Sequence, residues 1–198
     1  LDVRARAEAQ VKKHVAQVEA QHAKEAAGAA GGGPRPVPAA ARPAEPAAAQ
    51  AAAPSTFVVM AAYRERRCLD TVVSAFEHAA WPSRLYFGVF QQRSEWEPDC
   101  EDYGAVCGRA DGAADAVVCR YRENVRVSRV DWTLSEGPCP SRAEAERLYR
   151  GEDFTLQIDA HSIFVDRWDA LLVENWRTLG SEYAVLSTYP PADGMAPR

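Results

Sequence analysis

The sequence TFVVMAA, residues 56–62, decides the fold, because a short apolar run of this length predicts a buried β-strand. Downstream of it, apolar residues recur at the spacing of one helix face: Leu69, Val72, Val73 and Phe76. They predict a helix that ends before Trp81 and Pro82. A strand followed at once by an amphipathic helix is the repeating unit of α/β proteins.

Four further apolar segments predict strands along the rest of the chain. They are RLYFGVF (residues 84–90), VRVSRV (125–130), FTLQI (154–158) and YAVLS (183–187). Helices are predicted between several of them, so strands and helices alternate. This alternation predicts an α/β fold in which a mainly parallel sheet has helices on both faces.

One of these helices precedes the fourth predicted strand. Ser141 and Glu144 form a Ser-x-x-Glu capping box, in which each side chain satisfies a backbone N–H group of the first turn. The box predicts a helix that begins near Arg142. We expect this helix to end at Gly151, because the residue that ends a helix commonly adopts the left-handed conformation, which glycine does readily.

The last helix follows the fourth strand. Apolar residues at helical spacing predict it: Trp168, Leu171, Leu172, Trp176 and Leu179. We expect Asp166 to cap its start and Gly180 to end it. Both tryptophans are assigned to the core, because helical spacing explains them.

The fourth predicted strand ends on two polar residues, Asp159 and His161, with only Ala160 between them. Ligands of open parallel sheets bind outside the carboxyl ends of the strands, so this position favours a functional role. Alternate residues of an extended segment point the same way, so both side chains can reach one divalent metal ion. Such an ion keeps coordination positions for the phosphate oxygens of a nucleotide. The alternative, which the tripeptide alone favours, is that Asp159 caps a turn and His161 is a partly buried imidazole.

Seven segments between residues 56 and 191 resemble, in order, successive segments of one enzyme family. They are AAYRERRCLDTVVSAFEHA, FGVFQQ, VRVSRVDW, EGPC, LYRGEDFTLQIDAH, WDALLVENW and VLSTYPP. The family is that of the metal-dependent polypeptide N-acetylglucosaminyltransferases that modify hydroxyproline. It is related more distantly to the mucin-type polypeptide N-acetylgalactosaminyltransferases. The resemblance implies a GT-A, Rossmann-like domain that binds a nucleotide sugar.

The resemblance also implies roles for residues around the fourth strand. Asp159 and His161 would bind Mn²⁺ or Mg²⁺, and Asp159 would also contribute to the nucleotide-sugar site. Arg142 would support the nucleotide or its diphosphate; alternatively, it is a surface residue that pairs with Glu146 one helical turn away. The turn GPCPSR has Pro140 where the family pattern leads us to expect an aromatic or small residue, which leaves the placement of Arg142 open.

Residues at the ends of the first two strands are implied to bind the rest of the nucleotide. Ala62, Tyr63 and Arg64 lie where such folds seat the nucleoside, and the Tyr63 ring would cover the base. Gln91 would offer its amide to the base or the ribose. Without the resemblance, an ordinary loop aromatic and a solvated charge are the favoured interpretation of Tyr63 and Arg64. For Gln91 the alternative is a polar strand end.

From the resemblance we expect a transferase that moves N-acetylglucosamine from UDP-GlcNAc to a hydroxyl of a protein acceptor, with hydroxyproline as a candidate. It implies retention at the anomeric carbon, although no residue is identified as the nucleophile. One alternative is a module that binds the nucleotide sugar without turnover. A metal-dependent hydrolase is disfavoured, because such sites usually use three or more ligands and His161 is the only histidine after His78.

The composition argues against other classes. The net charge is −5 and the Lys and Arg residues are scattered, so no basic surface for nucleic acid is predicted. The five cysteines are widely spaced without a Cys-x-x-Cys pair, which indicates neither a disulfide framework nor a zinc site. We expect reduced thiols and a cytoplasmic location, and leave open one bridge among Cys100, Cys107 and Cys119. The Golgi lumen, with a membrane anchor upstream, is the alternative.

The chain divides into three parts by composition. Residues 1–27 predict a polar helical stem, in which Val11, Val15 and Val18 make a narrow stripe that suits either a short coiled coil or an exposed, frayed helix. Residues 28–54 are rich in Ala, Pro and Gly and predict a disordered linker. Residues 55–198 predict the α/β domain. Because about 140 residues are few for this fold, we expect it to be incomplete at its C-terminus and to bind donor without efficient turnover.

Overall fold

The computed structural model describes residues 47–108 and 115–188. By its internal contacts the chain divides after Ala40, and all of the described residues belong to the second unit, Ala41–Arg198. The predicted stem and most of the predicted linker lie outside the described residues. The end of that linker differs from the prediction, because Ala47–Ala52 form a short helix, α2, as the high helix propensity of alanine favours.

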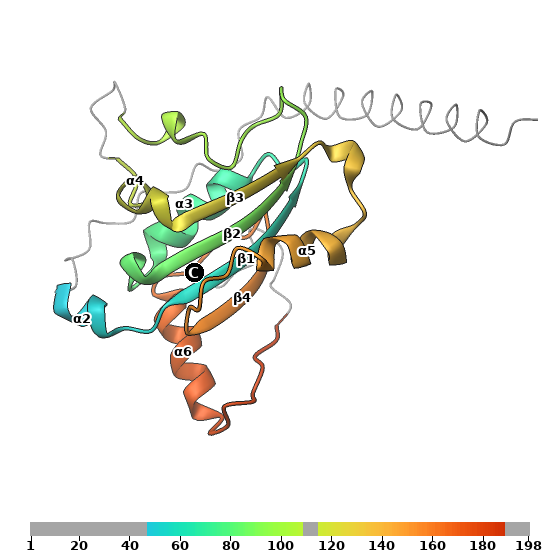
Figure 1. Ribbon diagram of the computed structural model, residues 1–198. Helices are drawn as coiled ribbons and strands as arrows, with labels where there is room; N and C mark the ends of the chain where they lie inside the picture. Colours follow the sequence, from blue (N-terminus) through green and yellow to red (C-terminus); the bar gives the residue numbers. More distant parts are fainter. Residues whose placement is uncertain (1–46, 109–114, 189–198) are drawn as a thin grey trace, which may run out of the picture. The chain divides into compact units, whose positions relative to one another are not determined.

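The core element is a four-stranded sheet in which all neighbouring strands are parallel (Figure 1). Its strands are β1 (Thr56–Tyr63), β2 (Leu85–Gln92), β3 (Val125–Val130) and β4 (Phe154–Asp159), in the order β3-β2-β1-β4. The four predicted strands up to residue 158 are therefore confirmed, and the fold is α/β.

Helices cover both faces of this sheet, as predicted (Figure 1). One face packs against α3 (Cys68–His78), α4 (Val118–Tyr121) and α6 (Trp168–Thr178). The other face packs against α5 (Pro138–Glu146) through Phe57, Val59, Phe90 and Ala145. At Gly88 a Cβ atom would lie 2.3 Å from the ring of Phe57 and 2.7 Å from the carbonyl oxygen of Ala145, so the approach of α5 requires glycine there.

Short 3₁₀ helices complete the described connections. They are η1 (Pro82–Arg84), η2 (Tyr103–Ala105), η3 (Arg122–Asn124) and η4 (Trp132–Leu134). None of the described helices is long and apolar enough to cross a membrane.

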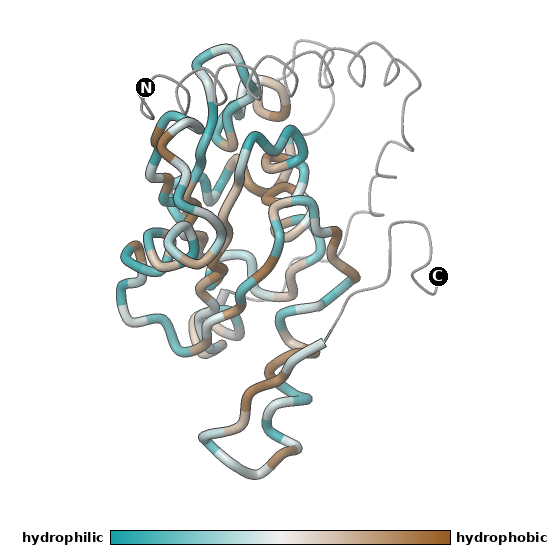
Figure 2. The backbone as a smooth tube through the Cα atoms, turned by 90° about the vertical axis from the view of Figure 1, so that its right-hand side faces the viewer, coloured by the Kyte–Doolittle hydropathy of each residue, from teal (hydrophilic) through white to brown (hydrophobic). Residues whose placement is uncertain are grey.

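The predicted fifth strand, residues 183–187, is not formed. This segment contains a turn in which the N–H of Ala184 donates to the carbonyl oxygen of Ser181. Tyr183 and Val185 are each 86% exposed, so none of the described elements provides a layer against which this apolar pattern packs. Figure 2 shows such apolar residues along the lowest part of the tube, in α6 and the segment that follows it.

Helix α5 begins earlier than the capping box predicted. Gly137 precedes it with a φ of 99°, and Pro138 occupies the first helical position, where its fixed φ fits. Ser141 therefore lies inside the helix: its N–H and its hydroxyl both donate to the carbonyl oxygen of Gly137. The helix also ends earlier, at Glu146, and the predicted stop Gly151 lies in the segment beyond it.

Helix α6 is confirmed, but its orientation differs from the prediction. The residue before it is Arg167, with a φ of 60° and no side-chain cap, so Asp166 is not the cap. Asp169 is buried and accepts hydrogen bonds from the N–H groups of Ala80 and Trp81, at 2.7 and 2.8 Å. This anchor turns Trp168, Ala170 and Val173 into the core and leaves Leu171 and Leu179 exposed. Gly180, with a φ of 62°, follows the helix as expected.

The expectation of reduced thiols is wrong for four of the five cysteines. Disulfides join Cys68 to Cys100 and Cys107 to Cys119, and Cys139 is free and exposed. The second of these bridges lies within the loop where one bridge had been left open. The first was missed because its partners are 32 residues apart in sequence and meet only when the ends of β1 and β2 lie side by side.

Candidate functional site

The predicted site residues end neighbouring strands at one edge of the sheet. In the strand register Ala61 is paired with Asp159, Tyr63 with Gln92, and Gln92 with Val130. Paired residues of neighbouring strands point to the same face, and so do alternate residues of one strand. Tyr63, Gln92 and Asp159 therefore all lie on the face that α5 covers.

Arg142 of α5 and Asp159 of β4 are brought together by this arrangement. Nη2 of Arg142 lies 3.4 Å from Oδ1 of Asp159. The Asp159 side chain is 64% exposed, so solvent weakens the pair and a ligand can reach both groups. The alternative pairing of Arg142 with Glu146 is not the one observed.

The geometry around His161 differs from the expected extended segment. Ala160 and His161 form a turn, and Ser162 closes it by donating its N–H and its hydroxyl to the carbonyl oxygen of Asp159. The His161 side chain, 59% exposed, has its Nδ1 atom 3.3 Å from Oε2 of Glu65. Asp159 and His161 are thus both accessible at the same edge, although they do not alternate along a strand.

These two residues fit a divalent ion only as an open site. Across residues 47–108 and 115–188, no group of three or more His, Cys, Asp or Glu side chains could hold a metal. One carboxylate and one imidazole suit Mn²⁺ or Mg²⁺ when ligand oxygens and water complete the coordination. The donor set is therefore consistent with an ion held jointly by protein and diphosphate, and not with a closed structural site.

Gln91 and Gln92 have different environments. The Gln91 side chain is buried on the α3 face, where Nε2 donates to the carbonyl oxygen of Pro98 at 3.0 Å and Oε1 accepts from the N–H of Cys100 at 3.4 Å. The Gln92 side chain is buried on the α5 face, and its Nε2 donates to Oγ of Ser141 at 2.7 Å. Its Oε1 has no hydrogen-bond partner within the described part of the chain.

Gln92 lines a cavity of about 260 Å³ between β2, β3 and α5. The other lining residues are Phe90, Ser128, Val130, Leu134, Glu136, Pro140, Ser141 and Glu144. The lining thus combines apolar side chains with two hydroxyl groups, the Gln92 side chain and the carboxylates of Glu136 and Glu144. Such a combination suits a flat, neutral polar group, such as a nucleobase.

Ala62 and Tyr63 at the end of β1, and Arg64 just after it, have three different environments. Ala62 has its side chain in the core, so only its main chain is available to a ligand. Tyr63 is 52% exposed, with its ring accessible. Arg64 has a φ of 50° and a side chain only 7% exposed: its Nε lies 2.6 Å from Oε1 of Glu97, and its guanidinium lies 4.4 Å from the centre of the Trp132 ring. Arg64 therefore joins three loops at this edge.

Burial of Glu97 would raise the pKa of its carboxyl, but hydrogen bonds from Ser94 and Arg64 outweigh it and leave the pKa lowered. Glu97 is thus a stable anion beside Arg64. This pairing satisfies the charge of Arg64 without a ligand, and a role of Arg64 in nucleotide binding stays a prediction.

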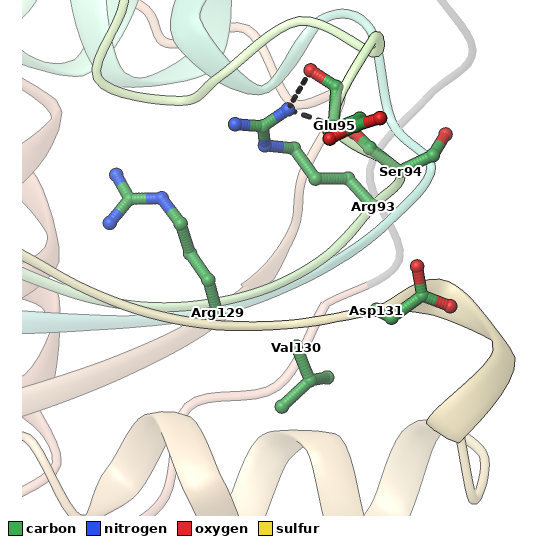
Figure 3. A pocket seen from close by; sticks show the side chains of 6 residues that line it. All are labelled: Arg93, Ser94, Glu95, Arg129, Val130 and Asp131. Atoms are coloured by element: carbon green, nitrogen blue, oxygen red, sulfur yellow. Dashed lines mark hydrogen bonds between the residues drawn. The ribbon is translucent and has the colours of Figure 1, made fainter.

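A second cavity, of about 300 Å³, lies at the ends of β2 and β3 (Figure 3). In Figure 3 the side chains of Arg93 and Arg129 extend to the same side of β3, whereas Val130 points to the other side, toward the helix below. Both guanidinium groups bind Asp99, at 2.9 Å each, and Arg129 also binds Glu101. Their positive charges are already neutralised, so this cavity offers little to an anionic ligand.

Comparison with known families gives the chain's affiliation. A family model described as Glycosyltransferase (GlcNAc) matches residues 55–118 and 103–194, which is well over half of the sequence. The chain belongs to this glycosyltransferase family. No curated protein matches it. Family membership supports transfer of a sugar, and this glycosyltransferase builds its candidate site on a parallel α/β sheet.

Two residues at this candidate site were not predicted from the sequence. Gln91 was predicted in place of its neighbour Gln92. The alternation of side chains along a strand could have identified Gln92, because it lies two residues after Phe90, which faces α5. Glu65 was not considered, and no local pattern marks it, since its contact with His161 forms only when β1 and β4 lie side by side.

Proposed function

We propose that this glycosyltransferase moves N-acetylglucosamine from UDP-GlcNAc to a hydroxyl of a protein, with hydroxyproline as the candidate acceptor, and that it requires Mn²⁺ or Mg²⁺. The observation that carries the proposal is the pair of Arg142 and Asp159, 3.4 Å apart and accessible at the carboxyl edge of a parallel sheet. We infer that the domain has a GT-A architecture with a nucleotide-sugar site at this edge.

The chemistry needed is stabilisation of a departing diphosphate. When bound, the divalent ion supplies Lewis-acid stabilisation of the charge that grows on that group. Arg142 exchanges its carboxylate partner for phosphate oxygens, with charge-assisted hydrogen bonds that its planar guanidinium favours. Asp159, released from Arg142, is then available with His161 to hold the ion.

We infer that the nucleoside binds at the same edge of the sheet. Tyr63 presents an accessible ring at the end of β1, and its strand partner Gln92 borders the cavity beneath α5. The hydroxyl groups and carboxylates that line this cavity are acceptors of the kind that the N–H of a uracil ring requires. We infer that the base occupies this cavity and that the diphosphate extends from it toward Arg142.

A second candidate is a module that binds a nucleotide sugar without turnover. It is favoured by the small number of metal-binding side chains at the edge, namely Asp159 and His161. A metal-dependent hydrolase is less consistent, because the described residues offer no cluster of three or more ligands.

The compartment and the partners remain proposals. Two disulfides are typical of proteins in an oxidising compartment, so they favour the lumen of the Golgi over the cytoplasm. A protein acceptor is the partner we propose, and we propose no binding to nucleic acid, in keeping with the net charge of −5.

Calorimetry of UDP binding, combined with product analysis, tests the proposal. UDP affinity is expected to be higher in Mn²⁺ than in EDTA, and the replacement Asp159→Asn should remove most of that difference. Equal affinity in EDTA and in Mn²⁺ would contradict the metal site. Mass spectrometry after incubation with UDP-GlcNAc and a hydroxyproline peptide separates the three functions, since a transferase gives glycosylated peptide, a hydrolase free sugar and a binding module neither.

A further inference from the structure

Glu65 and His161 meet at the candidate site from different loops. Glu65 lies in the connection from β1 to α3, and His161 lies in the turn after β4. Because β1 and β4 are neighbours in the sheet, these connections leave the same edge side by side. Oε2 of Glu65 lies 3.3 Å from Nδ1 of His161.

The protein holds Glu65 from its other side. Oε1 of Glu65 accepts a hydrogen bond of 2.8 Å from the N–H of Arg67, at the entry to α3. The next residue, Cys68, is fixed by its disulfide with Cys100. One carboxylate oxygen is therefore engaged by an anchored main chain, and the other lies within ion-pair distance of the imidazole.

A carboxylate beside one ring nitrogen determines the chemistry of the other. A neutral imidazole carries a single proton, on Nδ1 or on Nε2. A carboxylate next to Nδ1 stabilises the tautomer with the proton on Nδ1, which leaves the lone pair of Nε2 free. Histidines that bind metals in proteins commonly donate their other N–H to a carboxylate, which fixes the ring and increases its basicity.

We propose that Glu65 is a positioning residue, which holds His161 as the Nδ1–H tautomer and presents Nε2 to the divalent ion. The inference rests on the metal site of the proposed function. Glu65 would be the third acidic or imidazole side chain of that site, after Asp159 and His161. It would contact His161 and not the ion. Through Glu65, the connection from β1 to α3 would also help to arrange the turn that follows β4.

The replacement Glu65→Gln tests this role. Glutamine keeps an oxygen for the N–H of Arg67 and nearly the same shape, but it removes the carboxylate from His161. The first measurement is the tautomer of His161, from the nitrogen NMR shifts of its ring in the metal-free protein. The second is Mn²⁺ affinity in the presence of UDP, from electron paramagnetic resonance. The matched control is Glu123→Gln, because Glu123 is an exposed residue that pairs with Arg122 in η3, before β3 begins.

The wild type should show predominantly the Nδ1–H tautomer. Glu65→Gln should lose this preference and bind Mn²⁺ about 10- to 100-fold more weakly, as is usual when the partner of a metal-binding histidine is removed. Glu123→Gln should change neither quantity. A wild-type His161 with its proton mainly on Nε2 would overturn the inference without any variant.

The variant His161→Ala separates this inference from the proposed function. If His161→Ala binds Mn²⁺ as tightly as the wild type, the proposed metal site is wrong and the inference fails with it. If His161→Ala weakens binding but Glu65→Gln changes neither the tautomer nor the affinity, only the positioning role is overturned. Weaker Mn²⁺ binding by Glu65→Gln with an unchanged tautomer would also overturn that role, since Glu65 would then be a direct ligand.

Discussion

Gln92, at the end of β2, donates a hydrogen bond of 2.7 Å to the hydroxyl of Ser141, and that hydroxyl donates in turn to the carbonyl oxygen of Gly137. The bonds join the carboxyl edge of the sheet to the first turn of α5. Arg142 is the next residue of that helix, so the same bonds fix the position from which it reaches Asp159.

The replacement Gln92→Leu should therefore affect both stability and ligand binding. It removes the amide that joins β2 to α5, and we expect a loss of about 1–3 kcal/mol in the free energy of unfolding, the usual cost of a broken buried hydrogen bond. UDP affinity should fall as well, because Gln92 lines the cavity and holds the first turn of α5, from which Arg142 extends. Chemical denaturation and calorimetry measure the two effects.

Gln91→Leu is the matched control for this prediction. Gln91 is also a buried amide of β2, but its bonds go to Pro98 and Cys100 on the opposite face. It should lose stability and keep its UDP affinity. The reverse result, with UDP affinity lost only in Gln91→Leu, would support the sequence-based choice of Gln91 and contradict the role of Gln92.

The replacement Arg142→Ala should weaken UDP binding with little effect on folding. A charge-assisted hydrogen bond to a phosphate contributes about 1.5–3 kcal/mol, so affinity should fall by that amount. The pair with Asp159 is exposed and contributes little to stability, so the melting temperature should hardly change. Arg147→Ala, which removes an exposed pair elsewhere on the same helix segment, should leave UDP affinity intact. A lower melting temperature with unchanged UDP affinity would instead assign Arg142 a packing role.

The sequence predicted the features of the fold that depend on local apolar pattern. The run at residues 56–62 became β1, because central strands of a parallel sheet bury continuous apolar runs. The segment before Asp159 became β4 at the end of the described sheet, where half-buried apolar residues alternate with exposed polar ones. Asp159 accordingly lies at the carboxyl edge, where it was expected. The segment at 183–187 has the same local pattern but no partner strand, so pattern alone could not distinguish it.

Features that depend on tertiary contacts could not be predicted. Gln92 differs from Gln91 only in the face to which it points, and the cavity beneath α5 exists only once the helix is packed. The bridge from Cys68 to Cys100 joins two loops that adjoin only in the assembled sheet. Glu65 reaches His161 for the same reason. Non-local pairs of this kind leave no spacing signature in the sequence.

The disulfides lead to a prediction about thiol chemistry and stability. Alkylation of the unreduced, unfolded protein should modify only Cys139, which mass spectrometry of its peptides would detect. Replacing both Cys68 and Cys100 by Ala should lower the free energy of unfolding by about 3–4 kcal/mol, the value expected for a loop of this length. Cys139→Ser should have no such effect. Modification of all five cysteines without reductant would contradict both bridges.

The buried pair of Arg126 and Glu152 predicts a specific response to acid. Nη2 of Arg126 lies 2.7 Å from Oε1 of Glu152, and the two side chains are 11% and 5% exposed. Burial alone would raise the pKa of the Glu152 carboxyl, but hydrogen bonds from the N–H of Arg150 and from Arg126 outweigh it and leave the pKa below the ordinary value of 4.5. The folded state therefore favours the charged carboxylate. Its contribution to stability is present above pH 4.5 and is lost as the pH falls below that value.

Glu152→Gln should accordingly be destabilised by about 3–5 kcal/mol at neutral pH, because Arg126 keeps its buried charge and loses its partner. The difference between wild type and variant should shrink as the unfolding free energy is measured at pH values progressively below 4.5, because the wild-type carboxylate then takes up a proton as well. The acid sensitivity of the variant should be reduced and not abolished, since Glu97 and Asp99 also have lowered pKa values. Glu144→Gln, at an exposed pair, serves as the control. A difference of equal size at both pH values would show that the loss comes from packing and not from the charge of Glu152.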